Sequence, residues 1–221
     1  MIESGILLGV DTCGAMGSIA LARLQNDALE LLGEKEIQGG ELSVALVQGI
    51  ADLLAEAGIA VHDLAGITAV AGPGSFTGIR VGLAAVKGLA EAANLPVVTV
   101  SRLALLADEA EASCAVLDAH RGQFYCGMYD SGEPREMLLT AGEINSMGGL
   151  TGRVAVCEET VAQLLEELYG EPELVRVQPP SAAAALRFSL SKWRAGELAD
   201  VALLDGYYLR GADAKVSAGR G

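Results

Sequence analysis

A strand that passes through a glycine-rich turn directly into a helix is the strongest constraint that this sequence places on its fold. Residues 69–89 read AVAGPGSFTGIRVGLAAVKGL, and the apolar run at 67–71 is typical of a buried strand. Glycine lacks a Cβ atom, so the backbone of such a turn can bend sharply and approach another segment closely. Three glycines supply this freedom: Gly72, Gly74 and Gly78. The segment predicts an α/β unit whose helix begins at the end of a buried strand.

The start of this helix fits two roles. Ser75 or Thr77 is placed to cap the helix, whose free N–H groups and dipole favour an anion. The turn therefore either binds a phosphate or carboxylate or only packs the helix close to the sheet. Arg80, just inside the helix, either anchors the turn or meets an anionic group. The Walker A and Rossmann patterns both fail, because Lys87 lies far along the helix and Thr77 replaces the third glycine.

Length, composition and net charge narrow the classes of protein to which this chain can belong. The 221 residues allow one large domain or two small lobes. Hydrophobic residues make up 51% of the chain and glycines number 28, which is typical of a globular protein and excludes a disordered one. The formal net charge of −14, without any run of Lys or Arg, argues against nucleic-acid binding by this chain alone.

The cysteines and the apolar segments predict a cytoplasmic protein. Four cysteines are scattered without a C-x-x-C spacing, as expected of small buried residues in a reducing compartment. The start MIESGILLGVD lacks the basic segment of an export signal, and its apolar run is short. Since no apolar segment is long and uncharged enough to span a bilayer, we expect no membrane association.

The first part of the chain predicts a complete α/β lobe. A hairpin pattern comes first, then an amphipathic helix closed by a glycine, and then a strand–helix–strand unit around the glycine-rich turn. The strands are expected at 6–10, 18–24, 29–37, 67–71 and 97–100, and the helices at 42–57 and 79–93.

The order of elements then starts again. The further strands are expected at 115–117, 123–129 and 154–156, and the helices at 101–112, 160–168 and 181–195. Asp11 and Asp118 occupy matching positions, each at the end of a first strand before a turn into an antiparallel partner. We therefore predict two lobes, residues 1–101 and 102–221, with a mobile tail from about residue 211.

A repeated lobe that opens on a strand ending in Asp resembles the ground plan of the actin-like ATPases. In that superfold the two hairpins straddle a nucleotide, and the Asp orients magnesium-bound water. The alternative is that Asp11 and Asp118 only cap their turns through hydrogen bonds to the backbone just after them. The sequence leaves both interpretations open.

Four strings taken together resemble one protein family. GVDTCGAMGSIALA, AVAGPGSFTGIRVGLAAVKGLA, VSRLALLA and LDAHRGQFYCGMY are similar, in order and spacing, to the TsaB family, also called YeaZ. The resemblance covers roughly the first three-fifths of the chain. It is weaker afterwards, where YYLR at 207–210 echoes the family's P-x-Y-L-R ending. One departure is that the family's frequent H-S-E at the start of the first long helix is absent here.

The resemblance implies a two-lobed actin-like (ASKHA) α/β fold, each lobe a mixed β-sheet with flanking helices. It also implies a non-catalytic bacterial subunit needed to make threonylcarbamoyladenosine in tRNA. Such a subunit pairs with a TsaD-like transferase and is joined by a TsaE-like ATPase. ATP or ADP and a metal are then expected in those partners, and the chain is expected to contact tRNA only indirectly, through the complex. Alone, the chain is expected to form a homodimer.

The same resemblance places the partner contact on the two first-lobe helices. Small residues at 78, 82, 85 and 92 make a groove at helical spacing, and Leu residues of the helix at 42–57 make an apolar ridge suited to it. Burial inside the chain's own fold gives the same pattern, so that alternative stays open. The predicted interface residues are Leu42, Leu46, Ile50, Leu53, Ile79, Gly82, Val86 and Leu89.

Catalysis by this chain finds little support in its residues. A helical metal site needs two histidines one turn apart, whereas His62 and His120 are far apart and fall in predicted loops. We therefore expect no catalytic residue, no metal site and no cofactor bound by this chain alone. The alternative is a stand-alone actin-like nucleotide-binding enzyme, such as a small-molecule kinase. It would use Asp11 and Asp118 for magnesium and the glycine-rich loops for phosphate.

Overall fold

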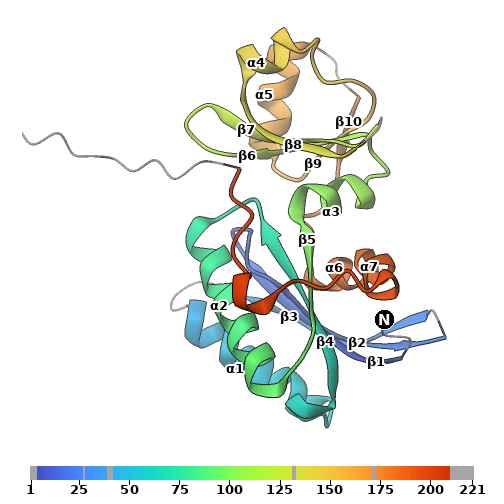
Figure 1. Cartoon of the computed structure of the whole chain (residues 1–221). Coiled ribbons are helices and arrows are strands. Elements are labelled where there is room, and N and C mark those ends of the chain that lie inside the picture. Colours follow the sequence, from blue (N-terminus) through green and yellow to red (C-terminus); the bar gives the residue numbers. More distant parts are fainter. Residues whose placement is uncertain (1–3, 27, 39–41, 131–132, 171–172, 210–221) are drawn as a thin grey trace, which may run out of the picture.

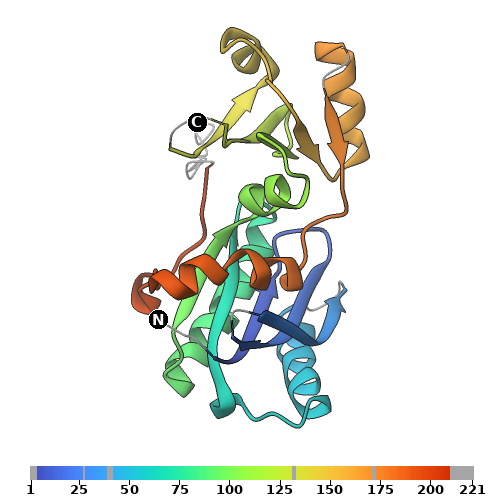
Figure 2. The same ribbon diagram turned by 90° about the vertical axis from the view of Figure 1, so that its right-hand side faces the viewer.

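Two five-stranded sheets, one in each lobe, form the framework of the protein (Figure 1). The computed structural model describes residues 4–26, 28–38, 42–130, 133–170 and 173–209. Seen from the side, one lobe lies above the other (Figure 2). The predicted mobile tail from about residue 211 lies outside the described residues.

The first lobe begins with an antiparallel hairpin and continues into strand–helix units. Its elements are β1 (Gly5–Asp11), β2 (Gly17–Gln25), β3 (Ala28–Ile37), α1 (Leu42–Glu56), the 3-10 turn η1 (Val61–Asp63), β4 (Leu64–Gly72), α2 (Phe76–Ala93) and β5 (Val97–Ser101). The strand order is β3-β2-β1-β4-β5, with β1 antiparallel to β2 and parallel to β4.

The second lobe repeats this order after a connecting helix. Its elements are α3 (Arg102–Glu109), β6 (Cys114–Asp118), β7 (Gln123–Met128), β8 (Arg135–Thr140), α4 (Ala141–Ser146), β9 (Val154–Val156), α5 (Glu159–Tyr169) and β10 (Leu174–Arg176). The strand order is β10-β9-β6-β7-β8, and β6 is antiparallel to β7 and parallel to β9. Each strand of the first sheet thus has a counterpart in the second. The predicted internal repeat and the two-lobed actin-like α/β fold are confirmed.

The chain then returns to the first lobe, so the predicted boundaries need a correction. Helices α6 (Ala182–Phe188) and α7 (Leu190–Ala195) are followed by the 3-10 turn η2 (Val201–Leu203). Helix α6 packs on β1, β2 and β4 of the first sheet, on the face opposite α1 and α2 (Figure 1). The assignment of all of residues 102–221 to the second lobe is therefore wrong, because the Ala-rich segment covers the first sheet.

A buried Trp fixes this returning segment. Trp193 is fully buried, and its Nε1–H donates to Thr68 Oγ1 at 3.0 Å. Thr68 Oγ1 lies 2.9 Å from Ser189 Oγ, which donates to the carbonyl oxygen of Leu186 at 3.0 Å. The chain of hydrogen bonds satisfies every polar group that the segment buries here. It also explains why the single helix predicted at 181–195 divides at Ser189 into α6 and α7.

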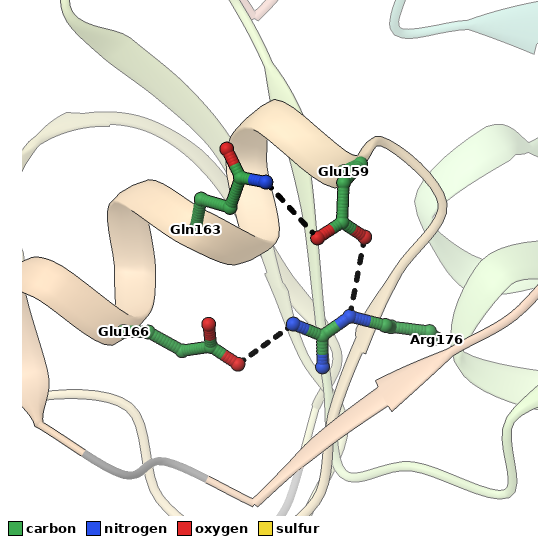
Figure 3. Close-up of polar contacts among 4 residues, drawn as sticks. All are labelled: Glu159, Gln163, Glu166 and Arg176. Atoms are coloured by element: carbon green, nitrogen blue, oxygen red, sulfur yellow. Dashed lines mark hydrogen bonds and ion pairs between the residues drawn. The ribbon is translucent and has the colours of Figure 1, made fainter.

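In the second lobe, α5 is joined to β10 by charged side chains on the surface (Figure 3). Arg176 donates from one terminal nitrogen of its guanidinium to Glu166 Oε1 at 2.7 Å and from Nε to Glu159 Oε2 at 3.3 Å. Glu159 Oε1 also accepts from Gln163 Nε2 at 3.3 Å. Exposed ion pairs of this kind contribute little to stability, so the network mainly orients the short strand against the helix.

Two thiols in the second-lobe core predict a loss of stability at high pH. Burial raises the pKa of Cys114 from an ordinary 9.0 to about 11, and burial together with Cys114 raises that of Cys126 to about 12. The folded protein then keeps protons that the unfolded chain loses, so the stabilisation is complete below pH 9 and is lost as pH rises towards 11 and 12.

The expected slope is up to about 1.4 kcal/mol per pH unit for each thiol. Urea denaturation at several pH values from below 9 upwards measures how the free energy of unfolding changes with pH. The variant Cys114→Ala/Cys126→Ala should lose this part of the pH dependence, and an unchanged alkaline slope in that variant would contradict the assignment.

Candidate partner-binding face and inter-lobe turns

The glycine-rich turn lies against the β1–β2 turn, where its glycines let two backbones meet. Gly74 has a φ of +158°, and a Cβ there would overlap the carbonyl group of Cys13. The N–H of Ser75 donates to that same carbonyl oxygen at 2.8 Å. Gly72, with a φ of +121°, has the backbone of Tyr207 beside it. Each of these positions therefore holds the turn against the chain's own backbone.

The small residues of α2 serve the same close approach. Gly78 and Gly82 face Thr12, and a Cβ at either position would overlap it. Thr12 Oγ1 donates to the carbonyl oxygen of Gly78 at 2.7 Å. The small residues of α2 were open to two interpretations, a partner contact or packing inside the chain's own fold. For Gly78 and Gly82, packing inside the fold is the correct one.

The helix start also has partners within the chain. Ser75 is the N-cap, and its Oγ accepts from the N–H of Gly78 at 3.2 Å, while Thr77 is exposed. The Arg80 guanidinium lies 3.8 Å from the centre of the Phe76 ring. Its Nε donates to Tyr208 Oη at 3.4 Å, which joins α2 to the segment that follows η2. These contacts favour the anchoring role of Arg80.

Asp11 and Asp118 make the same local hydrogen bond in the two lobes. Asp11 Oδ1 accepts from the N–H of Cys13 at 2.8 Å, and Asp118 Oδ1 accepts from the N–H of His120 at 2.7 Å. Each carboxylate therefore caps the turn that follows its strand, as the structural alternative requires. The matching geometry extends the internal repeat to individual side chains.

Arg102, which sequence reasoning missed, is a buried charge whose guanidinium lies beside Gly14 of the β1–β2 turn. It is 6% exposed at the start of α3, where the lobes join, and its Nε makes no hydrogen bond within the described residues. Burial raises the pKa of the Asp11 carboxyl, and the positive charge of Arg102 acts against that rise. The protein thus places its own cation beside Asp11. The string VSRLALLA contained Arg102, but nothing in it indicates that the guanidinium is buried.

Most of the predicted interface residues lie in the core of the first lobe, which corrects that prediction. Leu42 and Leu89 are only partly buried. The other six face the sheet or the β1–β2 turn and are buried: Leu46, Ile50, Leu53, Ile79, Gly82 and Val86. The helical spacing of apolar residues identified the inner faces of the two helices, because a core and an interface select the same residue types.

The outer faces of α1 and α2 carry the exposed apolar and small residues. Val44 and Val47 on α1 are 61% and 60% exposed, and Phe76 at the start of α2 is 55% exposed. Along α2 the exposed small residues recur every fourth position: Ala84, Gly88 and Ala92. The two helices contact each other on one side of the sheet, so these residues belong to neighbouring surfaces (Figure 1). The signal that could have identified them is that α1 has apolar residues on more than one side.

Among the described residues, no group of three or more His, Cys, Asp and Glu side chains could hold a metal ion. In the same part of the chain, no helix combines the length and the apolar character needed to cross a membrane.

Comparisons with known proteins give consistent similarities. Residues 36–165 match the family described as TsaD: tRNA N6-adenosine threonylcarbamoyltransferase. The tRNA threonylcarbamoyladenosine biosynthesis protein TsaB of Bacillus subtilis is 32% identical over 127 residues, which are 56% of this chain and 54% of that protein. Its Escherichia coli namesake is 31% identical over 133 residues, covering 58% and 56%. The chain thus spans little more than half the length of these two relatives.

The similarity of structure extends further along the chain. YeaZ from Pseudomonas aeruginosa superposes with a TM-score of 0.74 at 27% sequence identity, covering 93% of this chain and all of that one. The returning helices and both sheets are therefore part of an arrangement found in a solved protein.

Proposed function

Because the chain belongs to the TsaB/YeaZ family and its residues 36–165 match the TsaD family model, we propose that it is a non-catalytic subunit in the biosynthesis of threonylcarbamoyladenosine in tRNA. In this role it binds and stabilises a TsaD-like transferase subunit. The transferase and a TsaE-like ATPase hold the ATP or ADP and the metal. The complex works in the cytoplasm, and tRNA is contacted mainly by the partners.

The exposed outer side of α1 is the observation that supports a docking role most directly. Val44 and Val47 lie within one turn of each other and are more than half exposed, so apolar surface remains after α1 has packed on its own sheet. Small residues on the outer side of α2 allow a second helix to approach closely. A partner with the same fold can place its own helix pair there, and so can a second copy of this chain in the absence of the partner.

The electrostatics of the chain support an indirect role towards RNA. With a formal net charge of −14, the protein repels a phosphate backbone unless a partner supplies the positive surface. The internal hydrogen bonds of Asp11 and Asp118, and the contacts of Arg80 with Phe76 and Tyr208, support structural roles for these residues.

Two charges on the outer side of α1 should abolish the complex. In the variant Val44→Glu/Val47→Glu, both carboxylates would have to be desolvated on docking, which should weaken the pairing at least about 100-fold. The measurement is co-purification, followed by titration, with the TsaD-like protein of the same organism. Because both positions are exposed, circular dichroism and the thermal midpoint should match those of the wild type.

The matched control places the same charges on another helix. Leu164 and Leu168 on α5 are also exposed apolar residues, so Leu164→Glu/Leu168→Glu should pair as the wild type does. In cells that depend on this chain, the α1 variant should lower threonylcarbamoyladenosine in tRNA and the α5 variant should not. Unchanged pairing of the folded α1 variant would refute this docking face. If the wild-type chain does not bind the transferase but binds ATP in the absence of any partner, the result would instead support the stand-alone enzyme.

A further inference from the structure

The last described segment of the chain, residues 204–209, runs from the first lobe to the second. After α7 and η2 it passes α2 and rises along the side of the molecule towards the second lobe (Figure 1). We call this segment the strap. It contains most of the string YYLR at 207–210, to which the docking role of α1 gives no function.

On its first-lobe side the strap is attached to β4 and to the start of α2. The N–H of Tyr207 donates to the carbonyl oxygen of Ala71 in β4 at 2.8 Å. Tyr208 Oη accepts from Arg80 Nε at 3.4 Å, and the Tyr208 ring lies 5.5 Å from the ring of Phe76. Both Phe76 and Arg80 are exposed. The strap is therefore fixed to a part of α2 that another protein can reach.

On its other side the strap is attached to the second lobe. The Tyr207 side chain hydrogen-bonds to Glu136 of β8, whose Oε1 also accepts from Tyr129 Oη at 2.7 Å. Leu209 packs on the apolar cluster formed by α3, β6 and β9. Tyr207 is 41% exposed, so its contact with Glu136 can open without the unfolding of a core. Two neighbouring residues, Tyr207 and Tyr208, thus contact the second lobe and α2.

The proposed docking surface of α2 continues directly into the residues that the strap contacts. Phe76, Arg80, Ala84 and Gly88 recur every fourth position, so they form one exposed row along the helix. From Gly88 to Phe76 this row measures about 18 Å, the length of an ordinary helix of about 12 residues. A partner helix laid along the small residues would therefore also reach Phe76 and Arg80.

We propose that the strap couples docking on α2 to the position of the second lobe relative to the first. The proposal rests on the docking role of the outer faces of α1 and α2. A partner seated on Phe76 and Arg80 restricts the motion of Tyr208, and the adjoining Tyr207 then holds Glu136 more firmly. Because such a coupling free energy is reciprocal, loosening the contact between Tyr207 and Glu136 lowers the affinity for the partner.

Helix α3 also connects the lobes, but in a different way. It packs on β4, β5 and α6 of the first lobe and on β6, β7 and β9 of the second. This connection is present whether or not the outer face of α2 is occupied. The strap differs because the residues of α2 that it contacts, Phe76 and Arg80, are exposed where a partner would dock. It is therefore a link between the lobes that docking can change.

Hydrogen exchange of the full chain, followed by mass spectrometry, tests the coupling without any partner. Arg80→Met keeps the aliphatic stem and removes the group that holds Tyr208, so exchange should rise about fivefold in the strap and in β8. This is the factor expected for the loss of one hydrogen bond. Tyr207→Phe should raise exchange by a similar factor in the strap and in the first two turns of α2. Arg23→Met, at an exposed position on β2, is the matched control and should leave all three segments unchanged.

Titration with the TsaD-like protein of the same organism tests the effect on docking. Glu136→Gln keeps an acceptor for Tyr129 and removes the charge, and it lies in the second lobe rather than on α1 or α2. It should nevertheless weaken the pairing at least about fivefold, which is the lower end of usual coupling between sites. Glu167→Gln makes the same change at an exposed position of the same lobe and should pair as the wild type does.

Two results would overturn the proposal. One is unchanged exchange of β8 in Arg80→Met or of α2 in Tyr207→Phe, since the strap would then be only a local attachment. The other is wild-type pairing by folded Glu136→Gln. A wild-type chain that does not bind the transferase refutes the proposed function instead, and the exchange results still decide whether the strap links α2 to the second lobe. Thermal unfolding shows that each variant is folded before its result is interpreted.

Discussion

Replacement of Trp193 by alanine should lower the free energy of unfolding by about 3–5 kcal/mol, the range for removing a large buried aromatic side chain. The indole is fully buried between α7 and the first sheet. A second cost adds to the lost packing, because the variant leaves Thr68 Oγ1 without the indole N–H that donates to it at 3.0 Å. Urea denaturation followed by circular dichroism measures the change.

Two further variants separate the contributions at this site. Trp193→Phe keeps an aromatic ring and removes only the N–H, so it should cost clearly less than alanine. Leu198→Ala, a few residues later at a half-exposed position, should change stability by less than about 0.5 kcal/mol. A loss below about 1 kcal/mol in Trp193→Ala would mean that α7 does not hold the first sheet as described.

Alanine at two glycines of α2 should have effects of opposite sign. At Gly78 a Cβ would overlap the carbonyl oxygen of Thr12, so Gly78→Ala must shift the helix or the β1–β2 turn. We expect a loss of about 3 kcal/mol, since overpacking is added to the loss of the hydrogen bond from Thr12 Oγ1. At Gly88, where a Cβ meets no atom within 4 Å, Gly88→Ala should add about 0.5–1 kcal/mol through helix propensity.

Thermal and urea denaturation of the two variants test this contrast, because both make the same chemical change in the same helix. If Gly78→Ala proved as stable as Gly88→Ala, the close contact between α2 and the β1–β2 turn would be wrong. A stabilised Gly88→Ala variant would also show that a glycine of α2 lowers the stability of the protein only where no neighbouring atom requires its lack of a Cβ.

The framework of the fold could be predicted because its signals are local. The strand–turn–helix at β4–α2 and the hairpin of β1 and β2 follow from hydrophobic periodicity and turn chemistry. The sequence also narrowed the cap of α2 to Ser75 or Thr77, of which Ser75 is the N-cap. The repeat was visible from the equivalent positions of Asp11 and Asp118. The elements that sequence reasoning missed are short or carry mixed residues: β8, α4 and β10. A three-residue strand such as LVR has no period to detect.

The candidate site was predictable only in part. Hydrophobic periodicity identifies the apolar face of a helix, but it does not tell whether that face packs in the chain's own core or against a partner. Leu46 and Val86 fit a core and an interface equally well, and the structure assigns them to the core. Arg80 and Tyr208 are more than one hundred residues apart in the sequence and meet only because the chain returns to the first lobe. No local pattern carries that information, so this contact was not foreseen.

That return also affects how the protein is made. On the ribosome, β1 to β5 emerge long before α6 and α7, and the face of the first sheet with Leu7, Leu24 and Val98 has no cover until those helices follow. The nascent first lobe therefore carries an open apolar surface throughout synthesis of the second. Such a surface is a site for chaperones and for premature association. The first lobe becomes a finished folding unit only when nearly the whole chain has been translated.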